Sequence, residues 1–152
     1  MNPQRLTEKA QEAIAAAQHE SERRQHATLD VDHLLNALTT QAGGVVPRIF
    51  ERLNVIPATV QAGIDGALER AARLQYSAQP TLSGHLRNAL QRAEDEARGF
   101  NDDFISTEHL LLAALEAAPK SESVRVLVGL GLTRERIMLA LTQIRGSQRV
   151  TD

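Results

Sequence analysis

The sequence predicts an all-α fold in which two pseudo-symmetric four-helix repeats form one globular eight-helix domain. Hydrophobic residues make up 42% of the 152 residues but aromatic residues only 3%, so alanine and leucine carry much of the core. These two residue types favour helices, whereas aromatic residues favour strands. Apolar residues also recur at intervals of three and four, and the second half of the chain repeats the first.

The repeat is clearest in two tracts, 29–37 and 105–113. At an offset of 76 they share four identities, which are His33/His109, Leu34/Leu110, Leu35/Leu111 and Ala37/Ala113. The same offset pairs Leu6 with Leu82, Thr7 with Ser83, Ala13 with Ala89, Ile14 with Leu90 and Ala17 with Ala93. After one inserted residue the offset of 77 pairs Ile49 with Val126, Leu53 with Leu130, Val60 with Ile137, Ile64 with Leu141 and Ala67 with Ile144. The two halves of the chain thus align throughout with one inserted residue, which indicates a duplicated unit.

The first unit is expected to hold four helices, near residues 7–24, 30–40, 46–53 and 57–70. Thr7 and Asp30 are N-cap types, whose side-chain oxygens accept a hydrogen bond from a first-turn amide. Pro57 suits the first helical position, where its missing N–H is not needed. An apolar face at helical spacing supports the first helix, formed by Ala10, Ala13, Ile14 and Ala17.

The second unit is expected to hold four helices as well, near residues 83–98, 106–117, 121–129 and 133–145. Ser83, Ser106 and Thr133 are again N-cap types. Apolar pairs at the hydrophobic-staple spacing surround three caps of the chain, which are Leu29 with Leu34, Ile105 with Leu110, and Leu132 with Ile137. Glycines at 43–44, 99, 129 and 131 mark the breaks between helices.

The domain organisation follows from this reading. Repeat one covers residues 1–70, and repeat two covers residues 82–145. Residues 71–81 lack a clean period and are expected to link the repeats. Residues 146–152 are polar without an apolar stripe, and are predicted to begin a linker to a following domain.

Charge and composition exclude several classes of partner. The net charge is -2, so neither nucleic acid nor an anionic membrane is an expected partner. No apolar run approaches the ~20 residues that span a bilayer, and the N-terminus lacks the apolar core of a signal peptide. The chain has no cysteine, which is compatible with a cytoplasmic location.

No motif for chemistry is present, so the chain is not expected to be an enzyme. It lacks both glycine-rich phosphate-binding patterns, so no nucleotide cofactor is expected. The five histidines form no metal-binding pair. A hydrolase built on Asp102, Glu108 and His109 has no support from their spacing.

Two carboxylates occupy equivalent places in the repeats. Asp32 and Glu108 each lie in the first turn of the predicted helix that follows Asp30 or Ser106. The simpler interpretation is that they stabilise the positive helix N-terminus by ~0.3–1 kcal/mol. The functional alternative is an exposed carboxylate that receives a basic ligand.

Three tracts carry a family resemblance, Leu6–Ile14, Asp32–Leu38 and Phe104–Leu115. They resemble the Clp N-terminal domain of Hsp100-type AAA+ unfoldases, and the resemblance covers essentially the whole chain. The start, residues 1–9, and the end, residues 145–152, look most like the ClpB-type disaggregase branch.

The resemblance implies a function in protein disaggregation. Members of this branch are hexameric, ATP-driven machines that thread aggregated polypeptides through a pore together with the DnaK system. Their N-terminal domain contacts unfolded or aggregated clients and helps deliver them to the pore. The isolated domain is expected to be monomeric and to hydrolyse nothing. An alternative within the family is a docking module for a folded adaptor protein.

The resemblance also implies candidate site residues. Arg92, Glu96 and His109 match client-groove positions of some relatives, although all three are polar here. The methylene stem of Arg92 can still cover apolar surface. Thr7, Asp102 and Glu108 match positions implicated in chaperone function.

A more remote alternative concerns phosphorylated arginine. In ClpC-like relatives, the positions equivalent to Thr7 with Asp32, and to Ser83 with Glu108, help to hold that group. The residue types here are compatible with it, with Asp in place of Glu in the first pair and Ser in place of Thr in the second.

Overall fold

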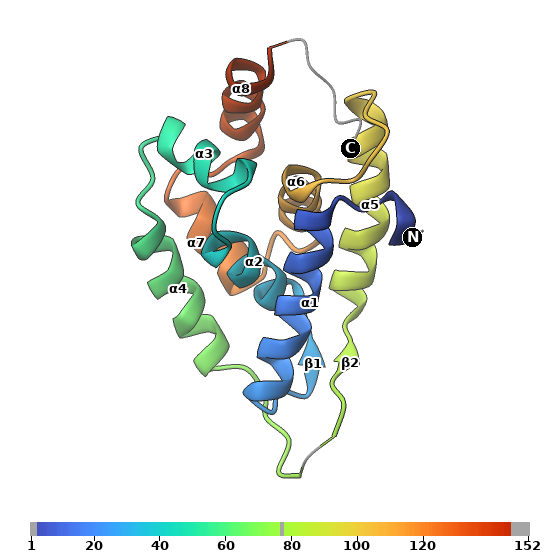
Figure 1. Cartoon of the computed structure of the whole chain (residues 1–152). Coiled ribbons are helices and arrows are strands. Elements are labelled where there is room, and N and C mark those ends of the chain that lie inside the picture. Colours follow the sequence, from blue (N-terminus) through green and yellow to red (C-terminus); the bar gives the residue numbers. More distant parts are fainter. Residues whose placement is uncertain (1–2, 77, 147–152) are drawn as a thin grey trace.

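The computed structural model describes residues 3–76 and 78–146. Within them, eight α-helices dominate and the predicted all-α class is confirmed (Figure 1). The first half holds a 3-10 turn η1 (Pro3–Arg5), α1 (Glu8–Arg23), the short strand β1 (Thr28–Leu29), α2 (Val31–Thr40), α3 (Val45–Arg52) and α4 (Pro57–Glu69). The second half holds the short strand β2 (Thr81–Leu82), α5 (Gly84–Gly99), α6 (Thr107–Ala117), α7 (Glu122–Gly129) and α8 (Arg134–Arg145).

The helix starts confirm the predicted caps. The hydroxyl oxygens of Thr7 and Ser83 accept hydrogen bonds from amides three residues on, at 3.2 and 3.0 Å. Asp30 and Ser106 form capping boxes in which the third helical residue is a histidine. A glutamate or glutamine usually fills that place, so His33 and His109 take over a local structural task.

The core is centred on α6. Every residue of α6 except Glu116 is buried, which is the pattern of a helix covered on all sides. Leu110, Leu111 and Leu112 have no exposed surface. The helices α1, α2, α3, α5 and α8 all pack against α6, so the two repeats share one core.

Two backbone connections join the repeats, and sequence periodicity predicted neither. The first is the parallel pairing of β1 with β2, in which Leu29 lies opposite Leu82. The second is a parallel bridge between Leu6 and Ile105. At the offset of 76, Leu6 corresponds to Leu82 and Leu29 to Ile105. The two connections are therefore counterparts under the internal symmetry.

The segment expected to link the repeats is more ordered than its composition indicates. The carbonyl of Ala72 accepts a hydrogen bond from Ala27 at 3.0 Å, and the amide of Leu74 donates to the carbonyl of Gln25 at 2.7 Å. Thr81, at the end of the segment, belongs to β2. These contacts hold the segment against the loop between α1 and β1 at one end of the molecule (Figure 1).

The close approach of α4 to α7 depends on Gly63. A Cβ atom at this position would lie 2.4 Å from Cγ1 of Val126, closer than packed atoms can approach.

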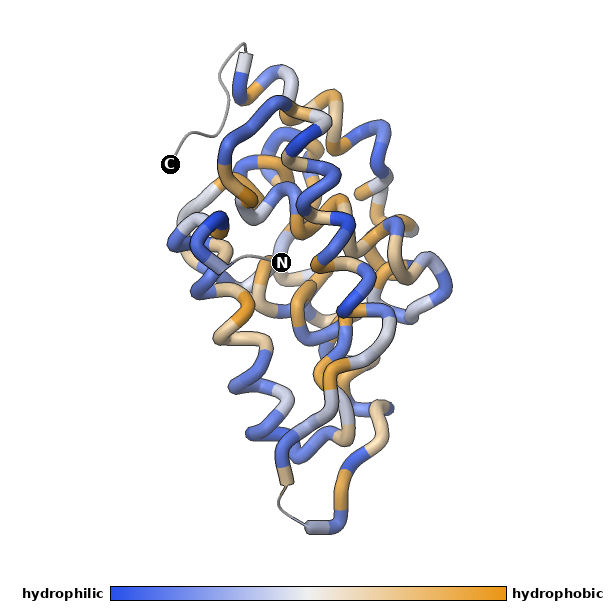
Figure 2. Tube along the Cα trace, turned by 90° about the vertical axis from the view of Figure 1, so that its right-hand side faces the viewer, coloured by the Kyte–Doolittle hydropathy of each residue, from blue (hydrophilic) through white to orange (hydrophobic). Residues whose placement is uncertain are grey.

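Apolar and polar stretches alternate along the trace (Figure 2). None of the described helices combines the length and the apolar character needed to cross a bilayer.

The described part of the chain ends one residue after α8. Gly146 follows it with a φ of 58°, a left-handed backbone conformation that glycine adopts easily. The predicted linker start at 146–152 lies outside the described residues except for Gly146.

Candidate functional site

The structure distributes six of the candidate residues over three places. Thr7 and Glu108 line one surface pocket. Arg92 and Glu96 line a second. Asp102 and His109 lie beneath the surface, only 5% and 0% exposed.

The Thr7–Glu108 pocket lies where the two repeats meet, beside the Leu6–Ile105 bridge. Its volume is about 410 Å³. Three helices begin at its rim: α1, α3 and α6. The lining residues come from these three starts, and they are Thr7, Glu8, Lys9, Gly44, Val45, Ser106, Thr107 and Glu108.

One of these three helix starts has no side-chain cap. Gly44 is the N-cap of α3 and makes no side-chain hydrogen bond to the first turn, whereas Thr7 caps α1 and Ser106 caps α6. The first amides of a helix have no acceptor within the helix. The amides of Val45 and Val46 at the start of α3 therefore lack a side-chain cap, and Pro47, the third helical residue, has no amide.

The carboxylate of Glu108 lies at the back of the pocket and is largely covered. Its side chain is 4% exposed, so the functional alternative of an exposed carboxylate at this position is wrong. The Ser106 hydroxyl donates a hydrogen bond to Oε1, and Nε of Arg145 lies 3.9 Å from Oε2. These two neighbours hold the carboxylate against the start of α6.

A buried polar cluster supports this pocket from below. The Ser106 amide donates to Nδ1 of His109 at 2.9 Å, so Nδ1 is unprotonated and Nε2 carries the ring proton. Nε2 then donates to Oδ2 of Asp102 at 2.7 Å. Burial lowers the pKa of His109, in agreement with this neutral form.

Arg145 completes the cluster from α8. Its Nη2 atom lies 2.5 Å from Oδ2 of Asp102, and its guanidinium carbon lies 4.8 Å from the centre of the Phe100 ring. Sequence reasoning missed Arg145 as a member of the site, because no spacing rule joins residues 43 positions apart. Asp102 and His109 are thus buried beneath the pocket, where they contact each other and Arg145.

The second pocket is polar and smaller, with a volume of about 280 Å³. The guanidinium of Arg134 forms two hydrogen bonds with the carboxylate of Glu96, one of them 2.7 Å long. Arg92 is exposed at the rim. The charged lining gives no apolar groove at these positions.

The repeat-related counterparts of Glu108 and Thr7, which are Asp32 and Ser83, are already engaged. The Ser83 hydroxyl donates to Oδ1 of Asp30 at 2.7 Å. Asp32 accepts a hydrogen bond from the Ser123 amide in the first turn of α7, at 3.3 Å. Burial raises the pKa of the Asp32 carboxyl. The two repeat-related places are therefore unequal in structure.

A small apolar crevice was also missed by sequence reasoning. It has a volume of about 40 Å³ and lies between α1 and α5. Leu82, 39% exposed, stands at its edge. Its walls are Ile14, Ala17, Leu29, Leu34, Leu82, Leu86 and Leu90. Helical periodicity cannot separate such positions from core positions.

The described residues also bear on metal binding. Among residues 3–76 and 78–146, no three histidine, aspartate or glutamate side chains come together as they would around a metal ion.

Comparison with known proteins places these features in a family. The model of the Clp repeat (R) N-terminal domain matches residues 5–128. The ClpB chaperone of Bdellovibrio bacteriovorus is 36% identical over 148 residues, which is 97% of this chain and 17% of that protein. ClpB 1 of Parasynechococcus marenigrum is 37% identical over 150 residues, 98% of this chain and 17% of that protein. The chain thus spans 17% of the length of these two relatives.

Solved structures share the fold. The Hsp104 N-terminal domain from Candida albicans superposes with a TM-score of 0.81 at 19% identity, covering 97% of this chain and 95% of that one. The N-terminal domain of the ClpV1 ATPase from E. coli has a TM-score of 0.78 at 24% identity, covering 96% and 88%. A ClpV N-domain in complex with a VipB peptide has a TM-score of 0.74 at 19% identity, covering 97% and 91%.

Proposed function

This chain belongs to the Clp repeat N-terminal domain family of the Hsp100-type ATPases, and we propose that it contacts unfolded or aggregated polypeptides for an ATP-dependent disaggregase. Its 152 residues contain no ATPase module, so its contribution is binding. In the parent protein it would help deliver clients to the pore of a cytoplasmic hexamer that works with the DnaK system.

The observation that carries this proposal is the Thr7–Glu108 pocket with the uncapped start of α3 at its rim. An unfolded client has no fixed sequence in common with the next client, but every client exposes backbone carbonyl groups. Free amides at the start of α3 are donors for such carbonyls. The side chain of Val45, which lines the same pocket, offers apolar contact. Recognition of this kind is promiscuous and weak, as repeated client engagement requires.

A titration followed by heteronuclear NMR tests the proposal. The labelled domain is mixed with ribonuclease A that has been reduced and carboxamidomethylated, which keeps it unfolded and basic. We expect fast-exchange shifts confined to Thr7, Lys9, Val45 and Thr107. The absence of shifts at millimolar ligand would reject client capture by this domain.

Two variants sharpen the test. Val45→Asp places a carboxylate at the start of α3, where it favours the helix dipole but competes with client carbonyls. We expect binding at least ten-fold weaker, and because Val45 packs partly against the core, the titration is run well below the thermal midpoint measured for the variant. Val128→Asp adds the same charge at a position of α7 that is 44% exposed, and binding should remain. Equal weakening by both variants would show that the loss of binding does not come from this pocket.

Docking of a folded adaptor is the second candidate. One structural neighbour, a ClpV N-domain, is a complex with a VipB peptide, so a domain of this fold can take one defined segment. Competition separates the two candidates. Under client capture, an unrelated unfolded protein should displace the bound ribonuclease A. Under adaptor docking, a single partner should saturate the domain, and unrelated unfolded proteins should not displace it.

A further inference from the structure

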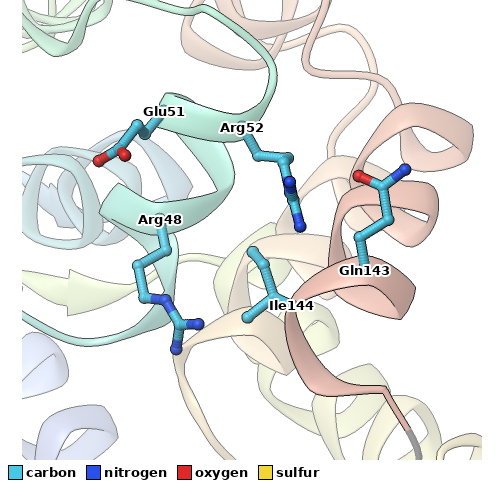
Figure 3. A pocket seen from close by; sticks show the side chains of 5 residues that line it. All are labelled: Arg48, Glu51, Arg52, Gln143 and Ile144. Carbon is cyan, nitrogen blue, oxygen red and sulfur yellow. The ribbon is translucent and has the colours of Figure 1, made fainter.

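A third pocket lies between α3 and α8. Its volume is about 410 Å³, and it is lined by Arg48, Glu51, Arg52, Gln143 and Ile144. Figure 3 shows the side chains of Arg48 and Arg52 extending toward the part of α8 that carries Ile144, while Glu51 points away from both guanidinium groups. The pocket shares no lining residue with the Thr7–Glu108 pocket.

The two arginines have no acidic partner in the described part of the chain, and neither forms an ion pair there. Many helix-surface arginines of this domain do pair with carboxylates, such as Arg23 with Glu20, Arg70 with Glu122 and Arg98 with Asp95. Glu51 stands three positions after Arg48, a spacing that allows a pair on a helix. Its side chain nevertheless turns away (Figure 3).

Local helix energetics do not account for this arrangement. Arg48 and Arg52 are four positions apart on one helix, where like charges repel and destabilise the helix. Arg52, in the last turn, is favoured by the helix dipole, but Arg48 lies in the first half of α3 and is not. A carboxylate between the two guanidinium groups would remove the repulsion.

We propose that the α3–α8 pocket binds an acidic segment of a partner protein, with one carboxylate held between Arg48 and Arg52. Guanidinium groups form strong, directed hydrogen bonds with carboxylates. The half-buried side chain of Ile144 provides an apolar floor for the aliphatic part of a glutamate or for a neighbouring leucine. Gln143 also lines the pocket, and a side-chain amide can both donate to and accept from the backbone of a bound segment. This surface is separate from the proposed client site, so each can be tested without the other.

Fluorescence anisotropy provides the test. The probe is a fluorescein-labelled peptide of sequence Glu-Leu-Glu-Glu-Leu-Glu, with a Gln-Leu-Gln-Gln-Leu-Gln peptide as the neutral control. We expect saturable binding of the acidic peptide only. Binding should weaken at least ten-fold in Arg48→Gln/Arg52→Gln, whose thermal midpoint should equal or exceed that of the parent domain because a repulsive pair is removed.

The matched control is Arg87→Gln/Arg125→Gln. It removes the same charge from two other exposed arginines, on α5 and α7, and should bind the acidic peptide within two-fold of the parent domain. Equal loss in both double variants would overturn the proposal in favour of non-specific charge attraction. No binding at millimolar peptide would overturn it as well, and so would binding of inorganic phosphate at this pocket without binding of the peptide.

Discussion

The Nε2 atom of His33 lies 2.7 Å from the Nδ1 atom of His26, and both side chains are buried. The amide of Asp30 donates to Nδ1 of His33 at 2.9 Å, so Nε2 of His33 carries the proton and donates it to His26. At the offset of 76, His26 corresponds to Asp102 and His33 to His109. Both histidines, His33 and His109, therefore carry their proton on Nε2. The acceptor is the neutral ring of His26 in repeat one and the carboxylate of Asp102 in repeat two.

This pair makes stability depend on pH. Burial, reinforced by repulsion from His26 when that ring is protonated, lowers the pKa of His33 from 6.5 to about 4. Between these values the unfolded chain binds more protons than the folded one, so stability is fully present above pH 6.5 and is lost as the pH falls toward 4. His33→Gln keeps a capping-box residue but cannot titrate. We expect it to reduce the pH dependence of the unfolding free energy by up to ~1.4 kcal/mol per pH unit.

Urea unfolding at pH 7, 6 and 5 measures this effect. His85→Gln is the control, because His85 is exposed and its replacement should leave the slope unchanged. If the unfolding free energy falls with pH equally in the parent domain and in His33→Gln, the buried histidine pair does not cause the loss of stability at acidic pH.

Arg145 anchors the end of α8 through a buried ion pair. Its side chain is 10% exposed and that of Asp102 is 0% exposed. Arg145→Met keeps the apolar contact with Phe100 but removes the guanidinium that lies 2.5 Å from Oδ2 of the buried Asp102, which should cost ~3 kcal/mol in unfolding free energy. Adding Asp102→Asn to Arg145→Met should recover part of the loss, because the buried negative charge that Arg145 balanced is removed with it.

The surface pair Arg98–Asp95 is the comparison for this prediction. Its side chains are 69% and 72% exposed, so Arg98→Met should change the unfolding free energy by less than ~1 kcal/mol. Equal losses of unfolding free energy in Arg98→Met and Arg145→Met, measured by denaturant unfolding, would show that the buried pair contributes no more to stability than the surface pair.

Gly63 is required for the packing of α4 against α7. The added Cβ of Gly63→Ala would meet the Val126 side chain at 2.4 Å, and we expect destabilisation of ~1–3 kcal/mol from overpacking. At Gly66, by contrast, a Cβ would approach the movable end of the Arg70 side chain at 2.9 Å. Gly66→Ala should be neutral or stabilising by up to ~1 kcal/mol, since alanine favours the helix. Thermal unfolding measures both variants. A lower thermal midpoint for Gly66→Ala than for Gly63→Ala would contradict this prediction.

Leu110 tests the shared core at the centre of α6. It has no exposed surface, so Leu110→Ala should cost ~2–5 kcal/mol through lost burial and the cavity left behind. Leu139 on α8 is 60% exposed, and Leu139→Ala should cost well under ~1 kcal/mol. Chemical denaturation compares the two, and a loss below ~0.5 kcal/mol at Leu110 would mean that the core relaxes around the cavity.

The sequence by itself determined the helices and their starts. Apolar spacing, the caps Thr7 and Ser83 and the glycine breaks predicted eight helices, each within two residues of its observed bounds. These signals are local, because a cap or an apolar face involves residues within one or two turns of each other. The resemblance carried by Asp32–Leu38 and its repeat was likewise readable in advance.

Only the tertiary structure decided which candidate residues face solvent and which support others. Asp102 and His109 carry polar side chains, yet the packing of α5, α6 and α8 buries them and adds Arg145 to their cluster. The two strand-like connections between the repeats and the pocket between α3 and α8 arise in the same way. These contacts join residues far apart in the chain, and their positions depend on how whole helices pack, which no local pattern specifies.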